Sequence, residues 1–165
     1  MVPVTAATVA FVLSLVAFAA AVPAHGKALE DRVGFGMEYF HFDNTAALSL
    51  RYFPSNYLSV DFMFGFNTDS LRKSTTLGIK LSRNLNLEEN MNFFVAVAGY
   101  LLSIRDPLIS TQQNTGVEFN GLLGAEFFLP GVPHLGVALE AGLALQSLST
   151  VVFQSVAGGA IHYYF

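Results

Sequence analysis

Cysteine is absent from this sequence. Its absence excludes disulfide bonds and thiolate metal sites, and it is compatible with an oxidising compartment such as the bacterial periplasm. Charged residues are also scarce, at 12% of the chain against about 25% in a typical soluble domain. The net charge is −4 and no lysine or arginine cluster is present. Because a nucleic-acid-binding surface needs such a cluster, we expect no nucleic-acid partner.

Long hydrophobic runs are missing after the first two dozen residues, although 53% of all residues are apolar and the mean hydropathy is +0.50. A membrane-spanning helix needs about 20 consecutive apolar residues. Glycine, serine, asparagine or a single charge interrupts every later apolar stretch within a few positions. The only other structure that spans lipid is a closed β-barrel. The chain therefore either buries its apolar residues in a core or turns them towards lipid.

Residues 1–25 have the features of a secretory signal peptide. An apolar run extends from Ala10 to Phe18, and small residues at 19–24 offer cleavage sites. No lysine or arginine precedes this run, and a single membrane-anchor helix is the alternative. The remaining residues, 26–165, are expected to form one domain, which is long enough for eight strands of about 10 residues with loops.

A period of two runs through this domain and predicts β-strands. The predicted strands are residues 33–40, 48–52, 58–66, 77–81, 93–102, 117–127 and 135–145, and a last strand that ends at Phe165. Short turns are expected at 43–44, 54–56, 84–90 and 130–133, and longer polar loops at 67–74, 103–115 and 147–154. An even number of strands places both chain ends on one side. Apart from the turn at 43–44, which is short where a long loop is expected, short turns alternate with longer loops, a pattern typical of transmembrane barrels.

The two faces of the predicted strands differ in residue size. One face carries leucine, valine, isoleucine, phenylalanine and tyrosine, and the other carries mostly glycine, alanine, serine and asparagine with single charges. A soluble barrel has an apolar interior and a polar exterior, whereas a membrane barrel is apolar outside. Eight strands leave an interior only wide enough for side chains, which suits the small residues. The sequence therefore predicts an all-β, eight-stranded, antiparallel, up-and-down transmembrane β-barrel.

Mid-strand charges then become interior residues. They are Glu38, Arg51, Asp61, Lys80, Glu118, Glu126, Glu140 and His162. Buried charges must be paired and hydrogen-bonded. If Phe53 pairs with Tyr57 across the Pro54 turn, Arg51 faces Ser59 and lies diagonal to Asp61, within reach of a long side chain.

Across the Pro130 turn, Glu126 and Glu140 become diagonal neighbours. Two adjacent carboxylates need a cation or a proton, so Lys80 or Arg51 is expected to reach them. The hypothesis is an ionic network that plugs the lumen, and the alternative is a gated polar path.

Catalytic patterns are weak. Glu126 and Glu140 form the best carboxylate pair for acid–base chemistry, but a structural network uses the same residues. His162 with Ser147 or Ser149 suggests a hydrolase, although these residues are expected at opposite ends of the barrel, too far apart for a triad. The four histidines lack the spacing of a metal site. The glycines at 34 and 36 and at 158 and 159 are not placed between a strand and a helix, as the glycines of a phosphate-binding loop are. We expect no enzyme activity and no cofactor.

The last strand alternates and ends on aromatic residues. Ile161, Tyr163 and Phe165 share one face, and His162 lies on the other. With this end, the alternating strands and the turn at 130–133, the chain resembles the small bacterial outer-membrane barrels of the OmpA/OmpX type. The resemblance implies that Ile161, Tyr163 and Phe165 form the signal that the barrel-assembly machinery recognises. It also implies localisation in the outer membrane of a Gram-negative cell, after export through the periplasm.

The expected function is a structural, envelope-integrity or surface-interaction role. The expected partners are outer-membrane lipid and lipopolysaccharide and, transiently, the assembly machinery and periplasmic chaperones, with the barrel as a monomer. A narrow channel or a conduit for small hydrophobic molecules is the first alternative. A lipid-modifying outer-membrane enzyme is the second, although the chain does not match the catalytic residues of the lipid A-modifying barrels.

Overall fold

The computed structural model describes residues 29–40, 45–68, 73–105, 113–148 and 150–165. The predicted signal peptide, residues 1–25, and the predicted turn at Asp43–Asn44 lie outside the described residues, as does Ser149. Within the described part of the chain, no helix is long and apolar enough to cross a membrane.

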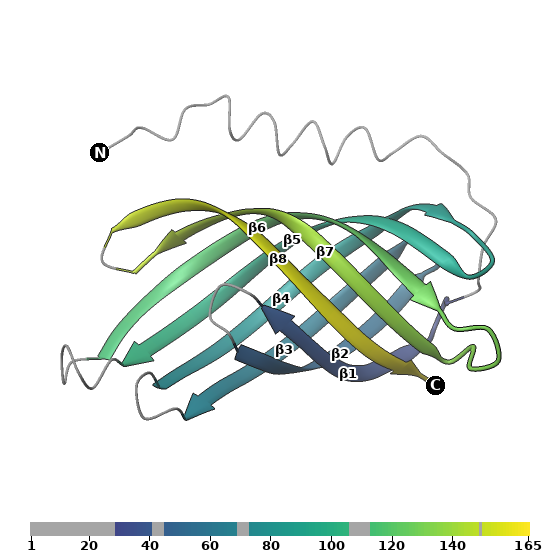
Figure 1. Ribbon diagram of the computed structural model, residues 1–165, viewed down its shortest axis with the longest axis horizontal. Helices are drawn as coiled ribbons and strands as arrows, with labels where there is room; N and C mark the ends of the chain where they lie inside the picture. Colours follow the sequence, from purple (N-terminus) through teal and green to yellow (C-terminus); the bar gives the residue numbers. More distant parts are fainter. Residues whose placement is uncertain (1–28, 41–44, 69–72, 106–112, 149) are drawn as a thin grey trace.

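Eight antiparallel strands form a closed barrel in which each strand pairs with its neighbours in the sequence and β8 pairs with β1 (Figure 1). The strands are β1 (Val33–Phe40), β2 (Thr45–Ser55), β3 (Leu58–Thr68), β4 (Lys73–Leu87), β5 (Met91–Arg105), β6 (Gln113–Phe128), β7 (Leu135–Ser147) and β8 (Val151–Tyr164). The predicted up-and-down, eight-stranded barrel is confirmed. Closure gives the backbone groups of both outer strands a partner, which an open sheet would lack.

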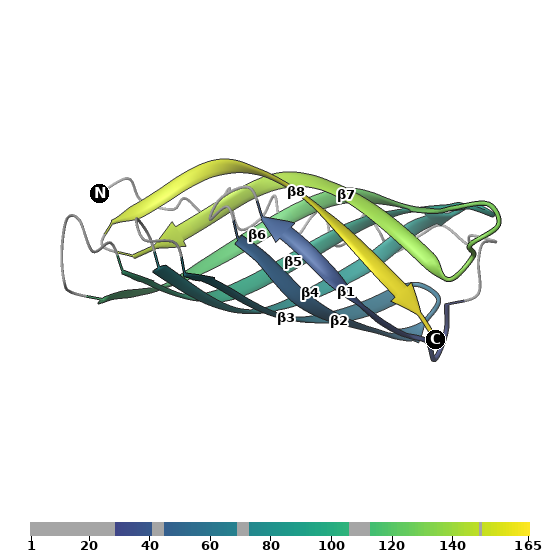
Figure 2. The same ribbon diagram turned by 60° about the horizontal axis from the view of Figure 1, so that its bottom comes forward.

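Both described ends of the chain lie at one end of the barrel, where Gly34 pairs with Tyr164. We call this the terminal end; it also holds the three short turns, at 56–57, 88–90 and 129–134. The opposite end is called the loop end. In Figures 1 and 2 the strands run obliquely between these two ends, with β8 crossing over the front of the barrel.

Outward and inward side chains alternate along the strands as the sequence predicts. On β3, Phe62 and Phe64 are 54% and 44% exposed, whereas their sequence neighbours Asp61 and Met63 are 0% and 3% exposed. A belt of leucine, isoleucine, phenylalanine and tyrosine therefore covers the outside, and the small and charged residues lie inside together with some larger apolar side chains such as Phe94. An exposed apolar surface of this extent is typical of contact with lipid.

Several strands run past their predicted ends. β4 continues to Leu87 through the predicted turn at 84–90, β5 and β6 extend into the predicted loop at 103–115, and β8 begins at Val151 inside the predicted loop at 147–154. Mostly polar residues continue the hydrogen-bonded ladder in β4, β5 and β6, whereas Val151 and Val152 begin it in β8. The ladder depends on the backbone, so it extends past the point where apolar alternation ends.

The hairpin between β2 and β3 has a different register from the predicted one. Ser55 pairs with Leu58 across a two-residue turn, and a bulge between Tyr52 and Ser55 shifts the pairing. Arg51 therefore lies directly opposite Asp61 instead of facing Ser59. The shift is by two residues, so every side chain keeps its predicted face.

Candidate functional site in the barrel interior

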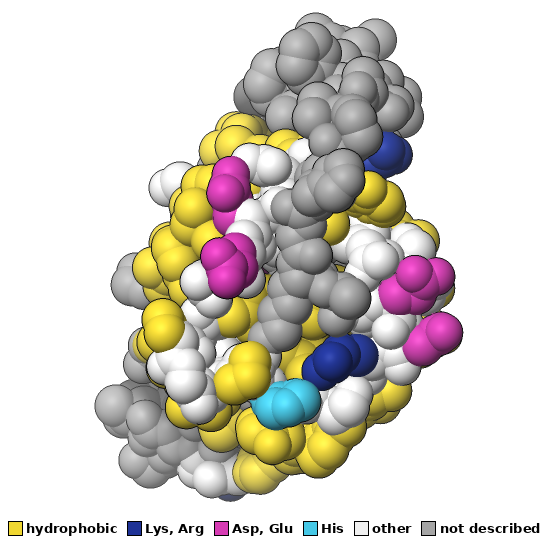
Figure 3. Space-filling model, turned by 90° about the vertical axis from the view of Figure 1, so that its right-hand side faces the viewer, with side chains coloured by type: hydrophobic (Ala, Val, Ile, Leu, Met, Phe, Trp, Pro, Cys, Tyr) yellow, Lys and Arg dark blue, Asp and Glu magenta, His cyan; other side chains and the backbone are white. Residues whose placement is uncertain are grey.

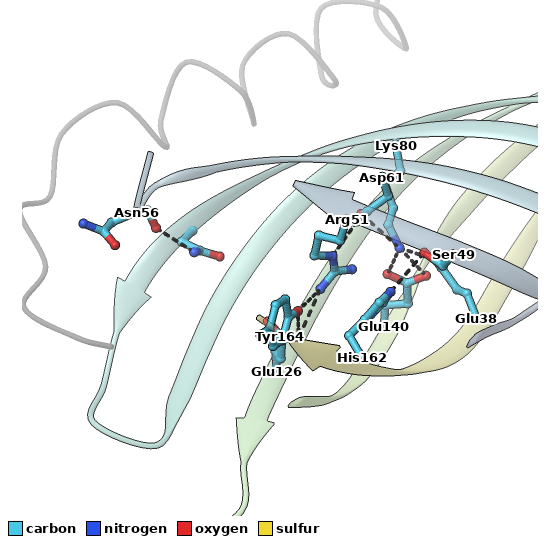
Figure 4. Close-up of polar contacts among 11 residues, drawn as sticks. Glu38, Ser49, Arg51, Asn56, Asp61, Lys80, Glu126, Glu140, His162 and Tyr164 are labelled. Atoms are coloured by element: carbon cyan, nitrogen blue, oxygen red, sulfur yellow. Dashed lines mark hydrogen bonds and ion pairs between the residues drawn. The ribbon is translucent and has the colours of Figure 1, made fainter. Parts of the chain in front are cut away.

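The eight predicted interior residues all point into the barrel and are buried, with at most 6% of any of them exposed. They come from seven strands: Glu38 from β1, Arg51 from β2, Asp61 from β3, Lys80 from β4, Glu118 and Glu126 from β6, Glu140 from β7 and His162 from β8. The even alternation of each strand positions them, because every second residue faces inward. Figure 4 labels all of them except Glu118 and shows them converging from different strands.

Arg51 is the centre of the first group of contacts. Its Nε donates to Asp61 Oδ1 at 2.5 Å, and its Nη1 donates to Glu126 Oε1 at 3.1 Å. Nη1 also lies 3.3 Å from the Tyr164 hydroxyl, which in turn donates to Glu126. A guanidinium has several donors in a fixed plane, so one arginine can hold two carboxylates and a phenol at once.

Lys80 is the centre of the second group. Its ammonium donates to Glu38 and, at 3.1 Å, to Glu140 Oε2. Asp61 Oδ2 lies 3.9 Å from the same Nζ. Asp61 therefore contacts both cations and joins the two groups into one network (Figure 4).

The paired charges and the tight packing of these side chains fill this part of the interior. Among the described residues, the network sets four carboxylates around two cations, and all six side chains are buried. A neighbouring glycine makes room for the network: a Cβ at Gly136 would lie 2.6 Å from Glu126 Oε1. The geometry is that of a packed, charged core that crosses the barrel.

Two of the predicted residues make contacts of a different kind. Glu118 Oε2 accepts a hydrogen bond from Gln146 Nε2 at 3.2 Å. His162 Nε2 lies 2.9 Å from Ser49 Oγ. No ion pair between either residue and Arg51 or Lys80 is found within the described part of the chain.

Sequence reasoning missed three participants: Ser49, Gln146 and Tyr164. Each lies on an inward position of its strand, so the alternation places it inside. Nothing in the alternation identifies its partner, because partners across the barrel come from strands that are distant in the sequence.

Comparison with solved structures identifies the architecture. The structure is similar to the N-terminal β-barrel domain of Pseudomonas aeruginosa OprF, with a TM-score of 0.65, 13% sequence identity, and coverage of 84% of this chain and 100% of that domain. The fold is that of a small outer-membrane β-barrel. Neisserial surface protein A is a second neighbour, with a TM-score of 0.59, 12% identity, and coverage of 81% of this chain and 94% of that one. The sequence matches no protein-family model and no curated protein.

The outer-membrane barrel fold separates the residues of the suggested hydrolase. Ser147 pairs with Val151 at one end of the β7–β8 ladder, and His162 pairs with Gly136 near the other end. A catalytic triad needs its members within hydrogen-bond reach, so these two residues do not form one.

The predicted carboxylate pair is divided between the two cations of the network. Glu126 and Glu140 are diagonal neighbours, since Glu140 pairs with Gly124 and Glu126 with Ala138. Each is held by a different cation, Arg51 and Lys80 respectively. In the part of the chain that the structure describes, no group of three acidic or histidine side chains is arranged to hold a metal ion.

The residues of the predicted assembly signal lie on the outside of the outer-membrane barrel. Ile161 and Tyr163 are 54% and 45% exposed on the outer face of β8, and the terminal Phe165 is 73% exposed. The Tyr163 and Phe165 rings pack edge to face with centroids 5.2 Å apart. The three side chains therefore form one continuous apolar edge at the terminal end.

Proposed function

We propose that the protein is an integral outer-membrane barrel with a closed lumen, and that its role is structural or surface-interacting within the envelope. The ionic network of Glu38, Arg51, Asp61, Lys80, Glu126 and Glu140 carries this proposal. Its members come from six different strands and hold one another across the barrel. A network that joins opposite walls stabilises the cylinder and leaves no room at that level for a passing solute.

In this proposal the terminal end faces the periplasm and the loop end faces the cell exterior. Short turns on the periplasmic side support this orientation. The outer apolar belt contacts lipid and lipopolysaccharide, and the barrel is a monomer. The edge formed by Ile161, Tyr163 and Phe165 is exposed for transient recognition by the assembly machinery and periplasmic chaperones. The separation of Ser147 from His162 along the β7–β8 ladder supports a non-enzymatic role.

Planar-bilayer recording of the refolded protein tests the closed lumen. We expect no steady large conductance, because Arg51 and Lys80 are each held by at least two acceptors. Steady large conductance in the unmodified protein would show an open polar path and would overturn the proposal in favour of a channel. The heat-dependent shift in gel mobility of the same preparation serves as the folding control.

A further inference from the structure

The terminal end of the barrel contains an apolar layer that the charged network does not include. Leu29, Phe53, Phe128 and Tyr164 form one buried cluster, and Leu29 is 0% exposed. The Tyr164 ring lies 5.8 Å from the Phe53 ring and 5.9 Å from the Phe128 ring, centroid to centroid. Three aromatic rings from β2, β6 and β8 thus surround one leucine that precedes β1.

Leu29 belongs to a short segment that is fastened to the barrel by its backbone. Asn56 Oδ1 accepts hydrogen bonds from the N–H groups of Leu29 and Glu30, at 2.7 and 3.0 Å. The Asp31 N–H donates to Phe53 O at 2.9 Å, and the Phe53 N–H donates to Arg32 O at 3.1 Å. Residues 29–32 are therefore held as an extension of the barrel wall.

A turn directs Leu29 inward. Asp31 has a φ of 59°, a left-handed conformation that aspartate tolerates better than most residues. The Arg32 N–H donates back to Leu29 O at 3.0 Å and closes the turn. At the rim, Arg32 Nη1 lies 3.3 Å from His134 Nδ1, and the Tyr52 hydroxyl donates to Asp31 at 3.2 Å. Charged and polar groups thus hold the outside of the segment while its leucine is buried.

Figure 3 views the barrel from the terminal end, where acidic and basic side chains are scattered around the rim among hydrophobic ones. The charged side chains of residues 30–32 are at this surface, and only Leu29 of the segment is buried. One apolar side chain of the segment therefore lies in the mouth of the barrel, and its polar side chains hold it from outside.

We propose that residues 29–32 are a stopper, in which Leu29 seals the terminal mouth of the barrel against the aromatic layer. The interior has two barriers in series, because Tyr164 belongs to the apolar layer through its ring and to the ionic network through its hydroxyl. Displacing the stopper opens the mouth to water while the ionic network stays in place. This inference rests on the proposed closed lumen, and its test does not depend on conductance.

Asn92 is a suitable reporter position behind the stopper. It is 0% exposed, and it pairs with Glu126, which is two residues further into the barrel than Phe128. Its side-chain amide has no hydrogen-bond partner among the described residues, so Asn92→Cys breaks no bond seen there. The native chain has no cysteine, so a thiol reagent reports on this position alone.

The experiment measures how fast a charged, membrane-impermeant methanethiosulfonate reagent modifies N92C in the refolded barrel. We expect slow modification in N92C alone and an increase of about tenfold to a hundredfold when Leu29→Ser is added, because the burial of one leucine no longer favours the closed state. Leu129→Ser, which removes an exposed leucine from the same end, is the matched control and leaves the rate unchanged.

Asn56→Ala is a second opening variant, because it removes the acceptor for both Leu29 and Glu30 N–H groups. It keeps the test valid if Leu29→Ser does not fold, as judged by heat-modifiable gel mobility. Fast modification of N92C with the stopper intact, or the same rate in all folded variants, would overturn the stopper. If conductance is low in the same experiments, the closed lumen proposed above still holds and only the stopper is wrong. The two proposals can therefore be told apart.

Discussion

Lys80→Met is expected to lower the free energy of unfolding of the bilayer-inserted barrel by about 3–5 kcal/mol. Methionine has a similar length and packs well, so little volume is lost. The change removes the cation shared by Glu38 and Glu140, and it leaves buried carboxylates without a counter-charge. Urea titration followed by gel mobility of unheated samples measures the change in stability.

Two further variants separate charge from packing. Lys73→Met makes the same substitution in the same strand at an exposed position and is expected to have little effect. Adding Glu38→Gln to Lys80→Met should recover part of the lost stability, because one unpaired charge is removed. An equal cost for the two lysine variants would show that the interior network does not stabilise the barrel.

Phe62→Arg is expected to destabilise the bilayer-inserted barrel by about 2–4 kcal/mol, because arginine near the bilayer midplane is costly. Phe62 lies on the outer face near the middle of β3 and is 54% exposed. Leu58→Arg is the matched control on the same face at the end of the same strand. Its expected cost is only about 0–1 kcal/mol, because the cost falls towards the interface.

The same urea titration compares the two arginine variants. A large difference between positions 62 and 58 supports a lipid-facing belt. Equal tolerance at both positions would indicate water outside the barrel, which is the soluble alternative with the same strand pattern.

The facing of each side chain could be predicted because it depends on a period of two. Asp61 and Phe62 are adjacent in the sequence and face opposite sides, so the alternation alone assigns one to the lumen and one to the exterior. The exact partner of Arg51 could not be predicted, because a bulge between Tyr52 and Ser55 leaves no mark on the apolar pattern.

The sequence led us to expect Arg51 or Lys80 near Glu126 and Glu140, but it could not predict which cation holds which carboxylate or that Tyr164 takes part. Tyr164 on β8 and Arg51 on β2 both donate hydrogen bonds to the carboxylate of Glu126 on β6. Strand closure and shear decide which inward side chains meet, and neither is encoded in a local pattern. Residues 29–32 were missed for a related reason, because four residues before the first strand carry no period to interpret.

A single-cysteine scan of positions 58 to 66 on β3 tests the central claim most directly, namely that the apolar face contacts lipid and the charged face is sealed inside. Each cysteine is spin-labelled in the barrel refolded into lipid bilayers, and the native chain supplies no competing thiol. We predict that labels at even positions such as Phe62 and Phe64 contact lipid-soluble oxygen. Labels at odd positions such as Ser59 and Met63 should be shielded from oxygen and from a water-soluble paramagnetic reagent. Even positions that contact the water-soluble reagent, or accessibility without alternation, would contradict this account.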